Sequence, residues 1–399
     1  MSKTIAYIGT WGNDLQGGDK GKAVAAGGIQ VFHLDTDKHL HFVSSVTPQV
    51  NSGILCCSPD KKFLYSTDER KDLNGVYGNG GGVCAYKVNQ SDGSLEFLNE
   101  VSSAGAYPCY IAIDAGQRFL FVSNHANHED AVTKSVCTPE GAYKAVRVFD
   151  EGSIAMFPIL EDGFVGECCD LKVLAGSSIK EWYQWTPHPH SVKLDPSNTF
   201  LLSGDKGSDK IYVFRVDYEH GKLIEAYCEN AKPGSGPRHI AFHPSLPFVY
   251  INSELDSTVH SFEMNFYNGS LRHMSKAKTI PVPYVPPDPD DQFAKNETAD
   301  IRVHKSGRFL YVSNRGHNSI AIFILDENGN IEHVDRISSG GEIPRAIGFD
   351  LSGDTLYAVN QRSGNIAQFS VDEASGRLTP TGYELRLNNP VCIDFIKLN

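Results

Sequence analysis

One pattern recurs along the whole chain, at intervals of roughly 45 to 50 residues where no insertion lengthens it, and this repeat restricts the possible folds most strongly. Each copy has a short apolar strand, a short polar turn that reads Asp-x-x-Gly in the last copy, a second apolar strand and then a polar residue. A further pair of strands follows each copy; KIYVFRVD, for example, is the first strand of one such pair. Four antiparallel strands per unit are typical of a β-propeller blade. The six complete copies read NSGILCCSPDKKFLYSTDER, YPCYIAIDAGQRFLFVSNH, HPHSVKLDPSNTFLLSGDK, GPRHIAFHPSLPFVYINSE, TADIRVHKSGRFLYVSNRG and IPRAIGFDLSGDTLYAVNQ.

The two chain ends supply a seventh copy between them. The C-terminal NPVCIDFIKL matches the first strand of a unit, and the N-terminal SKTIAYIGTW matches the second. A ring closed in this way leaves no free sheet edge. We therefore expect an all-β protein that forms a single seven-bladed β-propeller domain over residues 1–399, closed by N- and C-terminal strands in one blade. A pair of β-sandwiches is the alternative, but two sandwiches would not keep one register over the whole length.

Composition excludes several classes of partner. The formal net charge is -12, so the chain lacks the basic excess that binds nucleic-acid phosphates. No apolar run reaches membrane-spanning length, and the N-terminus has no signal-peptide pattern. The nine cysteines include no CxxC, which favours reduced and mostly buried thiols over disulfides. These features predict a cytoplasmic protein; they leave its oligomeric state open.

Two columns of equivalent positions stand out when the seven copies are aligned. The first opens the innermost strand of each blade, and the second ends the next strand. Because antiparallel neighbours start and end at the same sheet edge, both columns are expected at one mouth of the central channel. The second column holds six polar residues, which a core column would not. The first column is Gly53, Cys109, His190, Arg238, Ala299, Arg345 and Val391, and the second is Trp11, Glu69, His125, Lys206, Glu254, Arg315 and Gln361.

Departures from the repeat follow the second column or precede the first, so all are expected to overhang the same mouth. Insertions on one face of a repeat protein usually mark a binding face. The Pro-rich acidic stretch PVPYVPPDPDDQ is interpreted as an ordered lid or rim, with disorder as the alternative. The insertions are residues 12–28, 70–82, 126–146, 170–188 and 278–298.

The polar residues of three consecutive blades suggest acid–base chemistry on an anionic molecule. His190 has an ordinary pKa of about 6.5 and can serve as general acid or base. Arg238 and Arg315 present planar forks that match a carboxylate or phosphate and can stabilise an oxyanion. Glu254 can orient either kind of group. Further substrate contacts are predicted for the remaining mouth residues, Arg345, Lys206, His125, Glu69 and Gln361.

Several of these residues have plain structural alternatives. Arg238 and Glu254 could form a blade-to-blade ion pair. His188 and His190 could share a strand face and bind a metal, although no third ligand is near in sequence, so no metal is predicted. His239 and His243 are interpreted as caps of the strand turn. Acidic residues in the 284–291 loop could hold a divalent ion, but their spacing fits no known loop motif.

No cofactor is predicted either. The Gly-rich GVYGNGGGV follows no βαβ pattern, and no Gly-x-Ser-x-Gly elbow or activated cysteine motif is present.

The motifs YIGT, PHPHSVKLDP, GSGPRHIAFHP, SGRFLYVSNRGHNSIAIF and NPVCIDF resemble the seven-bladed propeller lactonase family over nearly the whole chain. That family includes propeller-type 6-phosphogluconolactonases and 3-carboxy-cis,cis-muconate lactonizing enzymes. The resemblance implies that a His, an Arg, a Glu and a second Arg form the active site, matching His190, Arg238, Glu254 and Arg315. The insert over 126–188 is long for the family, and its Trp182, Tyr183 and Trp185 could pack on a sugar ring or cover the blade edge.

The predicted function is hydrolysis of a lactone ring in a small anionic substrate at the channel mouth, 6-phosphogluconolactonase-like. A cycloisomerase that closes such a ring needs the same four groups and is kept as an alternative. A non-catalytic propeller that binds a protein or peptide is the alternative from another class, because fold does not determine function.

Overall fold

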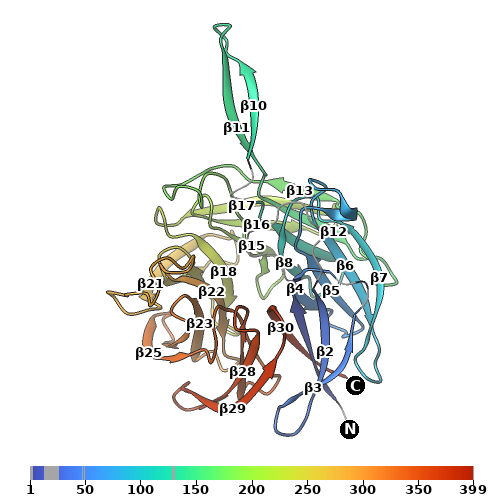
Figure 1. Cartoon of the computed structure of the whole chain (residues 1–399), viewed down its shortest axis with the longest axis vertical. Coiled ribbons are helices and arrows are strands. Elements are labelled where there is room, and N and C mark those ends of the chain that lie inside the picture. The colour runs from blue at the N-terminus through green and yellow to red at the C-terminus, as the bar shows by residue number, and fades with distance from the viewer. Residues whose placement is uncertain (1–2, 13–26, 47, 49, 128–130, 399) are drawn as a thin grey trace.

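Seven four-stranded antiparallel sheets form a ring in the computed structural model, which describes residues 3–12, 27–46, 48, 50–127 and 131–398 (Figure 1). We number the sheets as blades 1 to 7 along the chain, from the innermost strand outward. Blade 1 is β4 (Ser52–Cys57), β5 (Phe63–Asp68), β6 (Gly82–Val88) and β7 (Leu95–Ser102); blade 2 is β8 (Pro108–Ile113), β9 (Phe119–Asn124), β12 (Ser153–Pro158) and β13 (Asp170–Val173); blade 3 is β14 (Lys193–Leu194), β15 (Phe200–Asp205), β16 (Lys210–Asp217) and β17 (Lys222–Asn230).

Blades 4 to 6 repeat the same order, and blade 7 joins the two ends of the chain. Its strand β30 pairs antiparallel with β1, so the predicted closure by N- and C-terminal strands is confirmed. Blade 4 is β18 (Pro237–Phe242), β19 (Phe248–Ser253), β20 (Thr258–Met264) and β21 (Leu271–Lys278); blade 5 is β22 (Glu297–Val303), β23 (Phe309–Arg315), β24 (Ser319–Leu325) and β25 (Ile331–Ser338); blade 6 is β26 (Pro344–Phe349), β27 (Thr355–Asn360), β28 (Asn365–Val371) and β29 (Leu378–Arg386); blade 7 is β30 (Pro390–Lys397), β1 (Thr4–Thr10), β2 (Gly28–Leu34) and β3 (Leu40–Ser45).

The hydrophobic core lies between adjacent blades. Strands β15, β19 and β27 are buried along their whole length, because a neighbouring blade covers each of their faces. Each of these strands carries an apolar stretch and ends on a buried polar residue, whereas the outermost strand β21 has only one buried residue. A buried tyrosine on the second strand donates a hydrogen bond to a carbonyl in the outer turn of the next blade. The pairs are Tyr7 with Gly93 (2.9 Å), Tyr65 with Gly163 (3.1 Å), Tyr311 with Gly376 (2.7 Å) and Tyr357 with Lys38 (2.6 Å).

A β-bulge occurs at the first-column position of the innermost strand in six blades, all but blade 3. A bulge re-aims the side chain of the extra residue. It turns residues such as Arg238 and Arg345 away from the regular alternation of the strand. At Gly53 an added Cβ would lie 2.1 Å from Glu69 Oε2, so the small residue makes room for that carboxylate.

The insertions do not all overhang the mouth as predicted. Residues 131–149 form a hairpin of β10 (Ala131–Cys137) and β11 (Tyr143–Phe149), which stands well clear of the ring in Figure 1. The predicted insertion over 170–188 starts too early, because 170–173 is the outer strand of blade 2. The 70–82 segment carries a short 3-10 helix, η1 (Leu73–Gly75). Most of the 12–28 insertion lies outside the described residues.

All nine cysteines are free, which agrees with the expected absence of disulfides. Only three of them are buried, so the expectation of mostly buried thiols is wrong. Within the described parts of the chain, no helix has the length and apolar character needed to cross a membrane.

Candidate functional site

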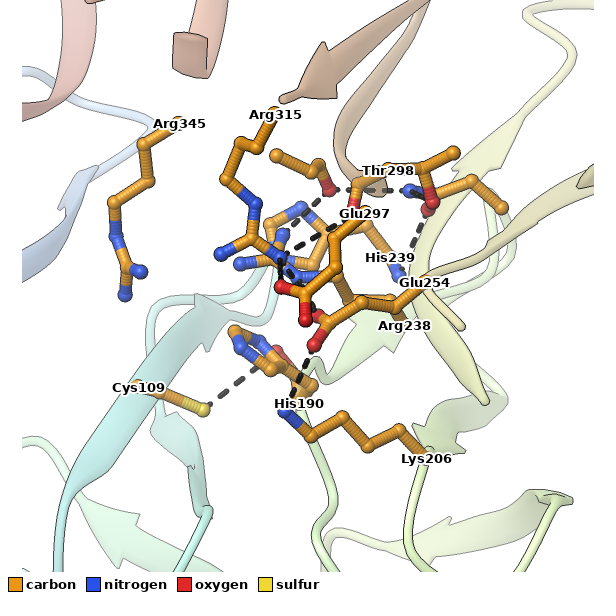
Figure 2. A network of polar contacts seen from close by, with 12 residues as sticks. Cys109, His190, Lys206, Arg238, His239, Glu254, Glu297, Thr298, Arg315 and Arg345 are labelled. Carbon is orange, nitrogen blue, oxygen red and sulfur yellow. Dashed lines mark hydrogen bonds and ion pairs between the residues drawn. The ribbon is translucent and has the colours of Figure 1, made fainter. Parts of the chain in front are cut away.

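Glu254 is the centre of a cluster of charged residues from three consecutive blades (Figure 2). Its Oε1 accepts a hydrogen bond from Lys206 Nζ at 2.8 Å, and its Oε2 accepts one from Arg238 Nε at 2.6 Å. Arg315 from blade 5 places a terminal guanidinium nitrogen 3.1 Å from the same Oε2. The alignment of blades thus brings four predicted residues together, and both carboxylate oxygens of Glu254 are occupied.

The charge of Glu254 is held in place by its surroundings. Its side chain is only 2 % exposed, and burial alone would raise the pKa of the carboxyl. Lys206, Arg315 and Arg238 outweigh this effect and hold the pKa of Glu254 well below its ordinary value. The carboxylate is therefore ionised at neutral pH and is a poor proton acceptor. It acts as the buried counter-ion of three cations.

Arg238 is 1 % exposed, and its donors point inward. One terminal nitrogen donates to the Ala299 carbonyl and lies 2.9 Å from His239 Nε2. Burial and the charge of Arg315 lower the pKa of Arg238 to about 10. The suggested ion pair between Arg238 and Glu254 does exist, but it lies within blade 4 and does not join two blades.

His239 is not the turn cap that the sequence suggested. Its Nδ1 lies 3.1 Å from Asp300 Oδ1, and Asp300 in turn pairs with Arg302 at 3.1 Å. The ring is held between a guanidinium and a carboxylate. His243, by contrast, caps the turn as predicted, because its Nδ1 accepts hydrogen bonds from two backbone N–H groups, at 3.2 and 2.9 Å.

The buried position of His239 predicts an acid-sensitive fold. Burial and the charge of Arg238 lower its pKa to about 3, so below pH ~6.5 the unfolded chain binds a proton that the folded chain does not. Stability is then expected to fall as the pH drops, and His239→Gln should remove about 1.5 kcal/mol of the loss between pH 6.5 and 5. Urea unfolding at both pH values measures this. Equal pH dependence in variant and wild type would contradict it.

His190 lies at the bottom of the same mouth. Its ring makes edge-on contacts with the rings of His125 and His239, with centroids 5.0 and 5.3 Å apart. Its Nδ1 is buried without a hydrogen-bond partner among the described residues. Burial, followed by the charge of Arg238, holds the pKa of His190 well below its ordinary value. The imidazole is therefore neutral at working pH.

Arg345 from blade 6 and Glu69 from blade 1 form a second charged pair near the cluster (Figure 2 draws Arg345 to the left of Arg315). Their closest atoms are 3.4 Å apart, a longer contact than those around Glu254. The Arg345 guanidinium also lies 4.1 Å from the centroid of the Trp11 ring. Burial raises the pKa of Glu69, against the opposing charges of Arg345, Arg238 and Lys206. Residues of blades 1, 3, 4 and 6 therefore influence one another across a single mouth.

The remaining predictions have mixed outcomes. Gln361 is buried after β27, at its predicted position, but the described contacts do not join it to the cluster. The His188 ring stacks on His125 at 4.9 Å, and its Nδ1 lies 2.8 Å from the His125 carbonyl oxygen. The described residues contain no group of three or more side chains able to hold a metal ion.

The aromatic residues of the 126–188 insert do not lie on the cluster. Trp182 and Trp185 pack at a tilt with centroids 4.5 Å apart, and Trp185 contacts Phe149 and Arg147 at the base of the hairpin. In the acidic 284–291 loop, Asp291 is paired with Arg362.

The sequence interpretation missed two residues of the mouth. Glu297, the first residue of β22, is the cross-strand partner of Arg315 and lies 3.1 Å from it. The Phe293 ring lies 5.2 Å from the Arg315 guanidinium. Both fall within the 278–298 insertion and outside the two columns. The sequence contains a signal for Glu297, because this carboxylate lies directly opposite Arg315 in the strand pair.

A separate groove of about 250 Å³ lies between blades 3 and 4, lined by Ile211, Phe262, His260, His273 and other residues. None of the predicted site residues lines it. The mouth cluster is consequently identified by its charges and contacts, and not by the groove.

A seven-bladed propeller in which several blades contribute to one cluster of buried charges defines the class of protein. Residues 6–395 match the family described as "Lactonase, 7-bladed beta-propeller". The chain belongs to this lactonase family.

Individual relatives agree with this membership. The chain is 30 % identical to a 6-phosphogluconolactonase of Bacillus subtilis over 398 residues, 99 % of each protein. It is 30 % identical to a 6-phosphogluconolactonase of Formosa agariphila over 368 residues, covering 90 % of this chain and 93 % of that protein. The solved structure of a periplasmic gluconolactonase from Pseudomonas aeruginosa superposes with a TM-score of 0.80, at 25 % identity and complete coverage of both chains.

Proposed function

We propose that this protein hydrolyses the lactone ring of a small anionic sugar acid at the mouth of its central channel. The observation that carries the proposal is the convergence of four cations and a neutral histidine there, from residues in four different blades. Family membership and relatives named 6-phosphogluconolactonase support the same reaction class. Sugar lactones with a phosphate or carboxylate are the expected substrates.

The contacts suggest different roles for the cations. Arg238 and Lys206 are used in holding Glu254, so we assign them to positioning. Arg345 has the longest of these carboxylate contacts, 3.4 Å to Glu69, and lies over the Trp11 ring, so it is our candidate to bind the substrate anion. Arg315 can stabilise the oxyanion that forms when water adds to the lactone carbonyl.

His190 is proposed as the group that accepts the proton of the attacking water. The tetrahedral intermediate then collapses, the ring C–O bond breaks, and protonated His190 returns its proton to the leaving ring oxygen, which gives a hydroxy acid and the neutral imidazole. Burial, followed by the charges of Arg238 and Lys206 among others, holds the pKa of His190 well below its ordinary value, so the imidazole is neutral and free to accept the proton of the attacking water.

A lactone panel tests the proposed function directly. The purified chain is mixed with glucono-1,5-lactone, its 6-phosphate and a carboxylated muconolactone, and acid release is followed against spontaneous hydrolysis. Accelerated release from the sugar lactones is the expected result. Ring closure of a muconate instead would support the cycloisomerase, and no turnover of any compound would support a binding protein.

Arg345→Leu is expected to separate binding of the anion from the chemical step. Loss of a charge-assisted contact should raise KM for the phosphorylated lactone about 10- to 30-fold. KM for the uncharged lactone should change less than threefold, and kcat should change little. Steady-state kinetics with both lactones measure this, and equal effects on the two would contradict the role.

A further inference from the structure

Glu297 differs from Glu254 although both contact the same nitrogen of Arg315, each at 3.1 Å. The Glu254 side chain is 2 % exposed and has three cationic partners, whereas Glu297 is 13 % exposed and shares its one cation. Figure 2 shows the Glu297 carboxylate beside that of Glu254, in the middle of the labelled group. Glu297 is thus the carboxylate of this pair that a bound molecule can reach.

Glu297 also changes the charge that a substrate meets. The mouth holds four cations, Lys206, Arg238, Arg315 and Arg345, against three carboxylates, Glu69, Glu254 and Glu297. Both Glu254 and Glu297 contact the same terminal nitrogen of Arg315, so its charge is largely balanced before a substrate binds. Its remaining donors can polarise the lactone carbonyl, but they would not hold a permanent substrate anion. Four cations against three carboxylates leave one positive charge, which is enough for one anionic group, placed at Arg345. A second anion next to Arg315 would lie beside the negatively charged Glu297.

We propose that Glu297 is a specificity-determining residue that selects hydroxyl-rich lactones and excludes substrates with a second carboxylate. This inference rests on the proposed function and names its substrate class. A carboxylate accepts hydrogen bonds from the hydroxyl groups of a sugar ring, and these are charge-assisted. The same carboxylate repels a substrate carboxylate at short range, and discrimination by a repulsive element is a common route to specificity.

The burial of Glu297 and the negative charge of Glu254 raise the pKa of the Glu297 carboxyl, and the positive charge of Arg315 opposes this rise. The proposal rests on the position of this acidic side chain, which is partly exposed and 3.1 Å from Arg315.

The test compares Glu297→Gln with wild type in two measurements that should move in opposite directions. KM for uncharged glucono-1,5-lactone should rise about tenfold, because an amide accepts weaker hydrogen bonds. The affinity for citrate, measured by calorimetry, should rise at least tenfold, because a repulsive charge is gone. Loss of charge repulsion cannot by itself weaken binding of an uncharged lactone, so the first result would show direct contact with the hydroxyls.

Glu342→Gln is the matched control, since Glu342 is an exposed glutamate in the loop before β26. It should leave both measurements within twofold of wild type. If Glu297→Gln also leaves both within twofold, or shifts both toward tighter binding, the proposal is overturned. If the protein opens no lactone, the proposed function is refuted. Citrate binding needs no turnover, so the calorimetry still decides whether Glu297 excludes carboxylates.

Discussion

Replacing His190 by glutamine is expected to lower kcat for lactone hydrolysis by about 10²- to 10⁴-fold, the usual contribution of a general base. Glutamine keeps a polar side chain of similar length but cannot accept a proton at neutral pH. Because the folded pKa of His190 lies well below 6.5, the imidazole is already neutral there. In wild type, kcat/KM should therefore stay flat from pH 8 to 6.5 and fall only in more acidic solution.

His220→Gln is the control for this experiment. His220 pairs with Asp217 on the surface at 2.9 Å, and its side chain is 68 % exposed. The control should match wild type in kcat and in its pH profile, and thermal unfolding should show that both variants are folded. A His190→Gln variant that keeps kcat within threefold of wild type would remove this residue from the mechanism.

Glu254→Gln is expected to destabilise the fold by about 3–5 kcal/mol, the usual consequence of removing one partner from a buried ion cluster. The amide has nearly the same shape, so packing is preserved and the change isolates charge. Lys206, Arg238 and Arg315 would remain beside it without their counter-ion. Chemical denaturation at pH 7 measures the free energy of unfolding.

Glu263→Gln provides the comparison, because Glu263 pairs with Arg272 on the surface, where both side chains are well exposed. Such exposed pairs contribute about 0–1 kcal/mol. Adding Lys206→Met to Glu254→Gln should recover part of the lost stability, since one uncompensated charge is removed. A loss below 1 kcal/mol for Glu254→Gln would mean that the three cations do not depend on it.

The repeat predicted the ring and the location of its polar residues, for a simple geometric reason. Antiparallel strands that follow each other place the end of one beside the start of the next, so equivalent positions in seven blades open on one mouth. The shared register alone brings together Lys206, Arg238, Glu254 and Arg315. Glu297 does not follow from the register, because it lies two positions before Ala299, the column residue of its blade.

Other errors have the same origin. The alignment placed the 126–146 insertion above the mouth, but its strands pair with each other and form a hairpin outside the ring. His239 was assigned to a turn, but the bulge at Pro237–Ile240 directs it toward Asp300 of the next blade. Pairing within an insertion and bulges within a strand depend on partners far away in sequence.

Strand order, blade number, ring closure and the column of charged positions follow from local alternation and a repeated register, both of which are present in the linear sequence. Which charges neutralise one another depends on distances across the channel and on the exclusion of water, and only the tertiary structure determines these. It makes Glu254 a fully buried counter-ion and leaves Glu297 and Arg345 partly exposed, a difference that residue type alone does not reveal. Burial separates them, because a charge withdrawn from water must take its partners from within the protein.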